Sequence, residues 1–152
     1  MEDVLFKGKR IDNCEWVEGL LGYCNFNHGV EKAIFVATEL GSIIPYRIKQ
    51  NTIGQYTGLK DKNGKKIFEG NIISAITLDT GKEQTAVVCF GNFIDENNGD
   101  EYIGFYIEFD GIKTTIAQLA MEECKNRIEV IGNIHDNPEL LKRGKKWNIL
   151  LK

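Results

Sequence analysis

Alternation of apolar and polar residues with a period of two is the feature that most constrains the fold of this chain. The clearest case is residues 102–109, where every second position is a large apolar residue: Ile103, Phe105, Ile107 and Phe109. Further strands are predicted at residues 14–26, 33–38, 43–49, 72–78, 85–90 and 127–135. The 16 glycines suit the many tight turns that short strands need. The sequence therefore predicts a mainly β protein.

Turn and helix signals separate these strands. The pair Asn63-Gly64 favours a type I′ hairpin turn, and Asp110-Gly111 is a second strong turn pair. The period changes from two to that of a helix only over residues 114–124, with Thr115 as the candidate N-cap. A helical turn is also predicted to begin at Asn137.

The order of these elements predicts two β subdomains and a tail. Residues 1–58 form a small N-terminal β subdomain, and residues 59–141 form an SH3-like barrel with one short helix. Residues 142–152 form a basic and apolar tail. The alternative is an open sheet with helices on one face, a ferredoxin-like arrangement. The barrel is preferred because helical periodicity appears only once inside the second half.

Charge is distributed unevenly along the chain. The net charge is −3, while residues 142–152 hold five basic residues and no acid, so residues 1–141 carry −3 − 5 = −8. An acidic body repels phosphate backbones and disfavours nucleic-acid binding by the whole domain. One basic turn keeps that class of function open, because it carries Lys60, Lys62, Lys65 and Lys66.

Cysteines and histidines give little support for a metal site. The four cysteines, at positions 14, 24, 89 and 124, never form a C-x-x-C motif, and we expect reduced thiols that pack as small hydrophobes. The best metal grouping, Cys14 with Cys24 and His28, matches no standard ligand spacing. No metal and no cofactor are therefore expected. The start of the chain has no signal-peptide core and no apolar run is long enough for a membrane span, so we expect a cytoplasmic protein.

Two uncommon strings resemble a known family. Residues 55–70 read QYTGLKDKNGKKIFEG and residues 128–141 read IEVIGNIHDNPELL. Together they resemble the signature blocks of the YopX family, small proteins encoded by bacterial phages and prophages. The resemblance implies a mainly β, SH3-like build inside the bacterial host cell, and it brings no established biochemical activity. The signature residues are Tyr56, Thr57, Gly58, Leu59, Asp61, Gly64, Glu69, Gly70, Gly132, Asn133, Asn137, Pro138 and Glu139.

The first block departs from the family pattern at one position. The pattern continues as Glu-Gly-Asp, whereas this chain has Glu69-Gly70-Asn71. If the family Asp were a catalytic or metal-binding carboxylate, this chain would be impaired. If it only closes a turn by a hydrogen bond, Asn71 replaces it without loss.

Neither block contains a convincing catalytic arrangement. Asp61 and Glu69 are a candidate acid/base pair, but a solvated turn rich in lysine is the preferred interpretation. His135 and Asp136 are neighbours in a predicted strand, so their side chains point to opposite faces. The glycine spacing does not match a phosphate-binding loop, and no nucleophile motif is present. We therefore expect a protein that is not an enzyme.

Two functions remain open. The first is a protein-interaction or self-assembling accessory module that binds an unknown phage or host protein and forms a homo-oligomer. Its candidate interface is the apolar part of the tail: Trp147, Ile149, Leu150 and Leu151. These residues either contact a second subunit or fold back on their own domain. The alternative function is a nucleic-acid-binding SH3-like module.

Overall fold

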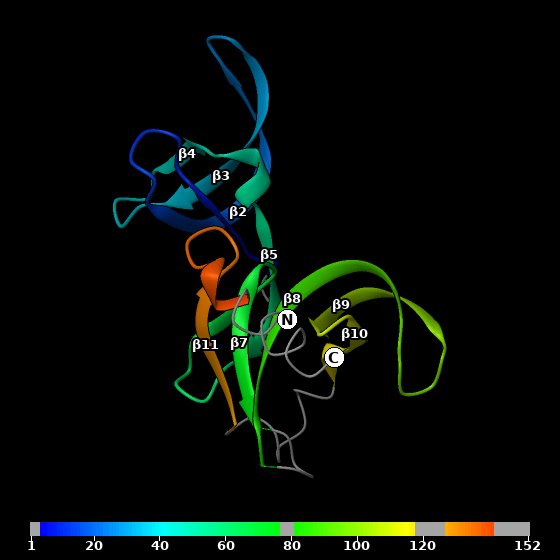
Figure 1. The fold of residues 1–152 in the computed structure, drawn as a ribbon. Coiled ribbons are helices and arrows are strands. Elements are labelled where there is room, and N and C mark those ends of the chain that lie inside the picture. Colours follow the sequence, from blue (N-terminus) through cyan, green and yellow to red (C-terminus); the bar gives the residue numbers. More distant parts are fainter. Residues whose placement is uncertain (1–3, 77–80, 118–126, 142–152) are drawn as a thin grey trace. The chain divides into compact units, whose positions relative to one another are not determined.

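The computed structural model of the protein describes residues 4–76, 81–117 and 127–141. Within them antiparallel strands are the main regular element, which confirms the mainly β prediction (Figure 1). Its contacts divide the chain into two compact units, residues 1–56 and 57–152.

Unit 1 is an antiparallel sheet in which each strand pairs with its neighbour in sequence. The strand order is β4-β3-β2-β1, with the start of β5 beside β1. The strand bounds are β1 Phe6–Lys9, β2 Trp16–Phe26, β3 Gly29–Ala37, β4 Ile43–Arg47 and β5 Gly54–Lys60, and a 3-10 helix spans Gln50–Thr52. Pro45 lies on β4, the outermost strand, a position where the missing N–H of proline is tolerated.

The core of unit 1 is small because the sheet is short. Ala33, Ile34 and Ile48 are fully buried. The backbone of β1 passes so close to them that a Cβ on Gly8 would lie 2.5 Å from Ile48 Cγ2. Glycine at position 8 is therefore required by the packing, since any side chain would displace Ile48.

Unit 2 holds a five-stranded antiparallel sheet. The strand order is β10-β9-β8-β7-β11, so β10 and β11 are its edge strands. The bounds are β7 Asn71–Ile76, β8 Glu83–Ile94, β9 Glu101–Phe109, β10 Ile112–Thr115 and β11 Ile128–Asn133. Strand β6, Lys66–Phe68, is not part of this sheet, because it pairs with β5 at the end of the other one. Strand β8, which includes the predicted strand at residues 85–90, is central in the sheet and lies between β7 and β9.

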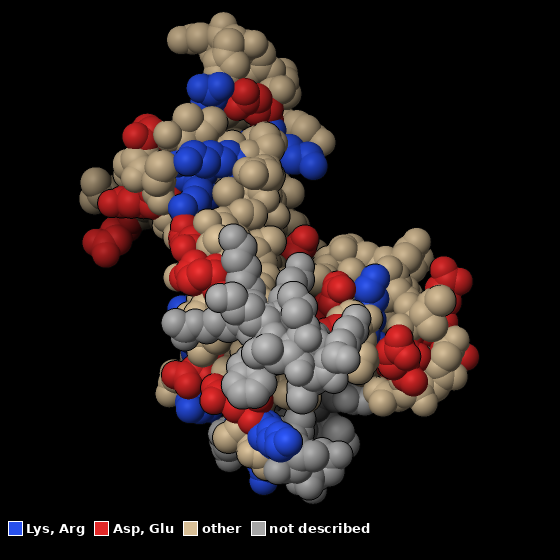
Figure 2. Space-filling model, viewed as in Figure 1, with Lys and Arg blue, Asp and Glu red and all other residues tan. Residues whose placement is uncertain are grey.

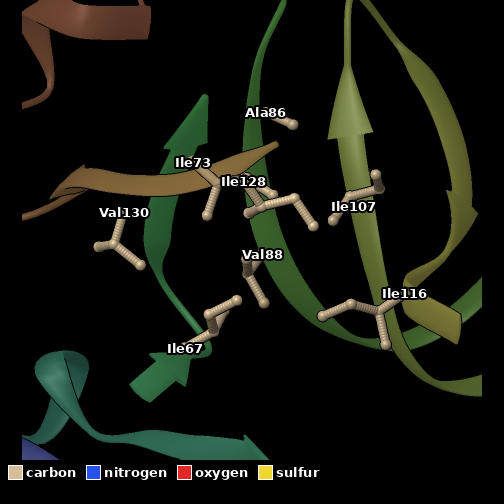
Figure 3. Packing of buried hydrophobic residues seen from close by; sticks show 8 residues of the cluster. All are labelled: Ile67, Ile73, Ala86, Val88, Ile107, Ile116, Ile128 and Val130. Carbon is tan, nitrogen blue, oxygen red and sulfur yellow. The ribbon is translucent and has the colours of Figure 1, made fainter. Parts of the chain in front are cut away.

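The core of unit 2 collects side chains from the strands and from the residue after β10 (Figure 3). Its buried members are Ile67, Ile73, Ala86, Val88, Ile107, Ile116, Ile128 and Val130. Full burial of each large aliphatic side chain contributes about 1.5–3 kcal/mol. Because Ile128 and Val130 come from β11, docking of this strand completes the core.

Both sheets are open in their strand order, and the described residues contain no closed barrel. The coarse prediction of a mainly β protein with little helix holds, and the SH3-like barrel stays a prediction. The predicted helix over 114–124 begins in a strand, because Thr114 and Thr115 belong to β10. Thr115 Oγ1 does accept the Ala117 N–H at 3.3 Å, as an N-cap would. Residues 118–124 and the tail 142–152 lie outside the described residues.

The structure confirms the predicted turn at Asp110-Gly111 but contradicts the turn type predicted at Asn63-Gly64. Asp110 and Gly111 have φ values of +52° and +79° and join β9 directly to β10, as a type I′ turn requires. Asn63-Gly64 is not a type I′ turn, because only Gly64 has a positive φ, +79°. The reason is Asp61, whose side chain accepts the Asn63 N–H at 2.9 Å and imposes a different turn.

Candidate functional site

Residues 57–70 of the first signature block and the second block both belong to unit 2, although about sixty residues separate the blocks in sequence. Hydrogen bonds between described residues join them. The Lys62 N–H donates to Ile128 O at 2.9 Å, and the Ile134 N–H donates to Gly70 O at 3.0 Å. The Val130 N–H donates to Asp61 Oδ2 at 3.0 Å. Much of the signature is therefore one structural unit, in which residues 61–70 bind β11 and the turn after it.

Asp61 is the centre of this unit. Its side chain is buried, with 7% of the residue exposed, and both carboxylate oxygens are used. Oδ1 accepts the N–H groups of Asn63 and Lys65 at 2.9 Å each, and Oδ2 accepts the N–H of Val130. The preferred prediction of a solvated turn carboxylate is wrong for Asp61, because three backbone donors replace water.

These donors also control the charge of Asp61. Burial by itself raises the pKa of the Asp61 carboxyl, but the backbone N–H groups of Val130, Lys65 and Asn63 outweigh it, and the pKa lies below its usual value of 3.8. Asp61 is thus a buried anion with its acceptor positions occupied. Such a group is poorly placed to exchange protons with a substrate or with Glu69.

A second aspartate, which the sequence interpretation passed over, repeats this arrangement. Asp95 is 2% exposed; its Oδ1 accepts the Asn97 N–H at 2.8 Å and its Oδ2 accepts the Thr115 N–H at 3.1 Å. The N–H of the next residue, Glu96, donates to Lys113 O at 3.1 Å. These backbone donors place the pKa of Asp95 below its usual value.

We call this arrangement the aspartate clasp. In each case an aspartate accepts an N–H from an edge strand, and the residue after it donates to the carbonyl two positions earlier on that strand: Val130 and Ile128 on β11, Thr115 and Lys113 on β10. The pair of bonds imitates one step of a β-ladder. The shared string Asp-x-Asn, at 61–63 and 95–97, is the sequence signal that connects them.

The other residues of the first block shape the approach to the Asp61 clasp. Thr57 Oγ1 donates to Ile67 O at 2.7 Å and accepts the Leu59 N–H at 3.2 Å, and Leu59 packs against the core. Gly58 has a φ of +85°, which favours glycine. Tyr56 is half-buried in unit 1, and its N–H donates to Leu5 O at 2.7 Å.

The departure at Asn71 keeps the geometry of the turn. Asn71 is 2% exposed, and its Oδ1 accepts the Phe68 N–H at 2.8 Å. Gly70, at a φ of +88°, donates its N–H to Val88 O at 2.8 Å. An amide oxygen serves the Phe68 N–H as a carboxylate oxygen would, so the role seen at position 71 is to close a turn.

Side chains of the second block also accept hydrogen bonds from the block's own backbone N–H groups. Asn133 Oδ1 accepts the N–H groups of His135 and Asp136, which ends β11 at Asn133, two residues earlier than predicted. Asn137 Oδ1 accepts the Asn133 N–H at 3.2 Å, and a Cβ on Gly132 would lie 2.5 Å from that oxygen. His135 and Asp136 therefore belong to a turn and not to a strand.

The predicted helical turn begins as expected. The Leu140 N–H donates to Asn137 O at 3.1 Å, and the Leu141 N–H donates to Pro138 O at 3.2 Å. Glu139 is exposed in the first turn, where a negative charge is favourable.

The described cysteines and histidines have the following surroundings. Burial raises the pKa of the Cys89 thiol, with the charges of Glu108 and Glu69 adding to the effect, so a reactive thiolate is disfavoured. Cys14 lies 3.2 Å from Lys49 Nζ, whereas His28 Nε2 lies 2.9 Å from Glu31 Oε1. Among the described residues no group of three His, Cys, Asp or Glu side chains is placed to hold a metal. No helix in the described part of the chain is long and apolar enough to cross a membrane.

The lysine-rich turn is partly neutralised. Lys62 Nζ lies 3.1 Å from Glu129 Oε2 on β11, and both side chains are close to half exposed. The cation most directly attached to the Asp61 clasp therefore has an acidic neighbour, and the basic turn is a weaker attractor for phosphate than its sequence implies.

The chain was compared with family models, with curated proteins and with solved structures. A crystal structure of protein EF1440 from Enterococcus faecalis is 25% identical in sequence; the match covers 93% of this chain and 99% of that chain, with a TM-score of 0.47. No curated protein matches the chain. The family model described as YopX protein matches residues 5–142, which include both signature blocks. The chain therefore belongs to the YopX family.

Proposed function

We propose that this protein is a phage or prophage accessory module that acts by binding protein, in the first place a second copy of itself, and not by catalysis. The proposal places it in the cytoplasm of the bacterial host and includes the SH3-like closure of unit 2 that the family resemblance implies. It is supported by the signature residues, whose polar groups are used largely for internal hydrogen bonds.

The observation that carries the proposal is an open strand edge in unit 1. Strand β2 pairs with β1 only through residues 16–19 and with β3 through residues 20–26. Among the described residues, the edge of 20–26 opposite β3 has no strand partner. Figure 1 shows this part of the β2–β3 hairpin extending beyond β4. An unpaired edge offers a row of backbone donors and acceptors to another strand.

Among the described residues, several other strand edges carry features that hinder pairing with another strand. Strand β4 carries Pro45, and the edge strands of unit 2 are bound by the aspartate clasps. Residues 20–26, LLGYCNF, contain no charge and no proline. Charges and prolines are the usual means by which proteins prevent strand pairing. The open edge lacks both.

Its side chains suit a second copy of the same edge. Leu20 and Tyr23 are 63% and 70% exposed. Because the segment is neutral, two copies meet without like-charge repulsion, and antiparallel pairing about a twofold axis gives each the same contacts. Pairing would also cover apolar surface that a lone monomer leaves in water.

The test combines the oligomeric mass with a cross-link. Light scattering on the full chain should give a dimer, and Tyr23→Lys should give a monomer. Ile43→Lys is the matched control, because Ile43 is 67% exposed on the edge that Pro45 protects. A short thiol cross-linker should join two chains through Cys24, so Cys24→Ser should abolish the product and Cys14→Ser should retain it. A monomeric full chain, or a dimer indifferent to Tyr23→Lys, contradicts the proposal.

The alternative of nucleic-acid binding rests on the basic turn. A titration with DNA and RNA at low and high salt separates the two functions. A steep salt dependence that is lost when Lys60, Lys65 and Lys66 are changed to Gln supports nucleic-acid binding. We expect no measurable binding at low salt.

A further inference from the structure

We propose that residues 142–152 of the chain bind, within the same molecule, an acidic hollow at the end of the β8–β9 hairpin of unit 2. The contact lies inside unit 2 and does not depend on the strand edge of unit 1. Both function and stability of the module would then involve a segment that the signature blocks do not include.

The hollow combines apolar walls with acidic rims. It has a volume of about 370 Å³, and its lining includes Phe93, Ile94, Glu96, Glu101 and Gly111. Ile94 is 60% exposed, and Glu96 and Glu101 are exposed as well. A large aliphatic side chain held in water beside two carboxylates matches a ligand that is both apolar and basic.

The surrounding charge favours the same ligand. Residues 81–117 contain seven acidic and two basic residues, a net charge of 2 − 7 = −5. Figure 2 shows acidic side chains gathered over the β8–β9 hairpin and its tip. The basic residue in the hollow, Lys113, lies 5.6 Å from the centre of the Tyr106 ring, which stabilises its charge.

Residues 142–152 have the complementary chemistry. They read KRGKKWNILLK, with five basic residues, no acid, and four large apolar residues between positions 147 and 151. A basic stretch therefore comes before an apolar one. This order allows the basic residues to pass the acidic rim while Trp147 contacts Phe93 and Ile94.

The segment starts beside the hollow. Leu140 and Leu141, the last described residues, line a neighbouring hollow of about 420 Å³ together with Phe109, Asp110 and Gly111. Gly111 lines both hollows. Trp147 follows Leu141 by six residues, which span about 20 Å when extended. Binding within the molecule is favoured over exchange with another copy, because the tether gives a millimolar effective concentration.

Fluorescence of Trp147 tests the proposal. The chain has two tryptophans, so Trp16→Phe leaves Trp147 as the single reporter in the full chain. Its emission should be blue-shifted and protected from acrylamide at every protein concentration. Adding Glu96→Lys and Glu101→Lys should lower the ratio of bound to free segment roughly tenfold, the size expected when two exposed ion pairs become repulsive. Ile94→Asp should give the same red shift through loss of the apolar contact.

Matched controls change the same properties elsewhere. Glu39→Lys and Leu40→Asp alter exposed positions of a unit 1 loop and should leave Trp147 emission unchanged. Circular dichroism should give the same melting temperature for Trp16→Phe as for the parent chain. If Trp16→Phe unfolds, hydrogen exchange of the Ile94 and Glu96 amides replaces the fluorescence measurement. It is measured on the chain with and without residues 144–152, and the protection of these amides must fall when the segment is deleted. Three results overturn the proposal: water-like emission of Trp147 in Trp16→Phe, a blue shift indifferent to the charge reversals, or a blue shift that grows with protein concentration.

Discussion

The loops that begin at Asp61 and Asp95 bind the two opposite edge strands of one sheet through the same pair of hydrogen bonds. Asp61 reaches 69 residues along the chain to Val130 on β11, whereas Asp95 reaches 20 residues to Thr115 on β10. Asp61 accepts three backbone N–H groups and Asp95 accepts two. Both aspartates are buried.

The difference between the two clasps lies in what each one holds. Strand β11 contributes two residues to the core of unit 2, Ile128 and Val130, and one of them is the donor to Asp61. Strand β10 contributes none of the core cluster itself, although Ile116 directly follows it. The same local device therefore stabilises the centre of the unit in one case and its periphery in the other.

Removing the carboxylates should give the largest difference between the two clasps in the free energy of unfolding. Asp61→Ala leaves three backbone N–H groups without their acceptor and loosens a core strand, so we expect a loss of about 4 kcal/mol in the free energy of unfolding. Asp95→Ala should lose about 2 kcal/mol, because two donors are affected. Urea denaturation measures both.

The conservative variants show whether the oxygens matter or only the volume. Asp61→Asn and Asp95→Asn keep one acceptor oxygen, and each should lose less than the corresponding alanine variant. Equal losses for Asp61→Ala and Asp95→Ala would mean that the distant strand adds nothing to the clasp.

Acid should weaken both clasps. The pKa of each aspartate is lower in the folded protein than its usual value of 3.8, so each stabilises the fold above that pH and stops doing so as the pH falls through the lowered folded value. One such group changes stability by at most about 1.4 kcal/mol per pH unit. Between about pH 5 and pH 2, the parent should lose stability more steeply than Asp61→Asn or Asp95→Asn. Parallel curves would show that the carboxylates are not selectively stabilised as anions.

Substitution of the glycines in the two loops should give the smallest difference in stability. Gly64 and Gly99 have φ values of +79° and +76°, and a Cβ on either would meet no atom within 4 Å. Changing either to Val should cost about 1 kcal/mol, from backbone conformation alone. Gly64→Asn should cost less, because Asn tolerates this conformation. A melting temperature unchanged in Gly64→Val would show that the turn adapts to another conformation.

Sequence patterns located β2, β3, β4, β7, β8, β9 and β11, because alternation reports burial directly, but they missed β1, β5, β6 and β10. Residues 102–109 and 43–49 became β9 and β4 within two residues at each end. Patterns failed where one side chain redirected the backbone. Asp61 changed the turn at Asn63-Gly64, and Asn133 shortened β11. Such hydrogen bonds depend on which strand lies nearby, which composition does not reveal.

The sequence predicted which residues belong to the candidate site, but it did not predict their burial or their hydrogen-bond partners. The resemblance to the YopX family identified Asp61 and Asn71, yet their burial follows from tertiary structure. Asp95 was passed over as part of a polar loop, although it shares the Asp-x-Asn string with Asp61. That short string is informative only once an edge strand is known to lie beside it.

The two clasp loops also differ in length. Asp61 N–H donates to Lys65 O, whereas Asp95 N–H donates to Asp100 O, so the second turn contains one more residue, and the left-handed glycine follows Asn63 directly but Asn97 after one step. Insertion of a residue between the Asn and the Gly is therefore compatible with the device. In the divergence of related sequences, gaps should be tolerated at this point while the Asp-x-Asn string stays in register with its edge strand.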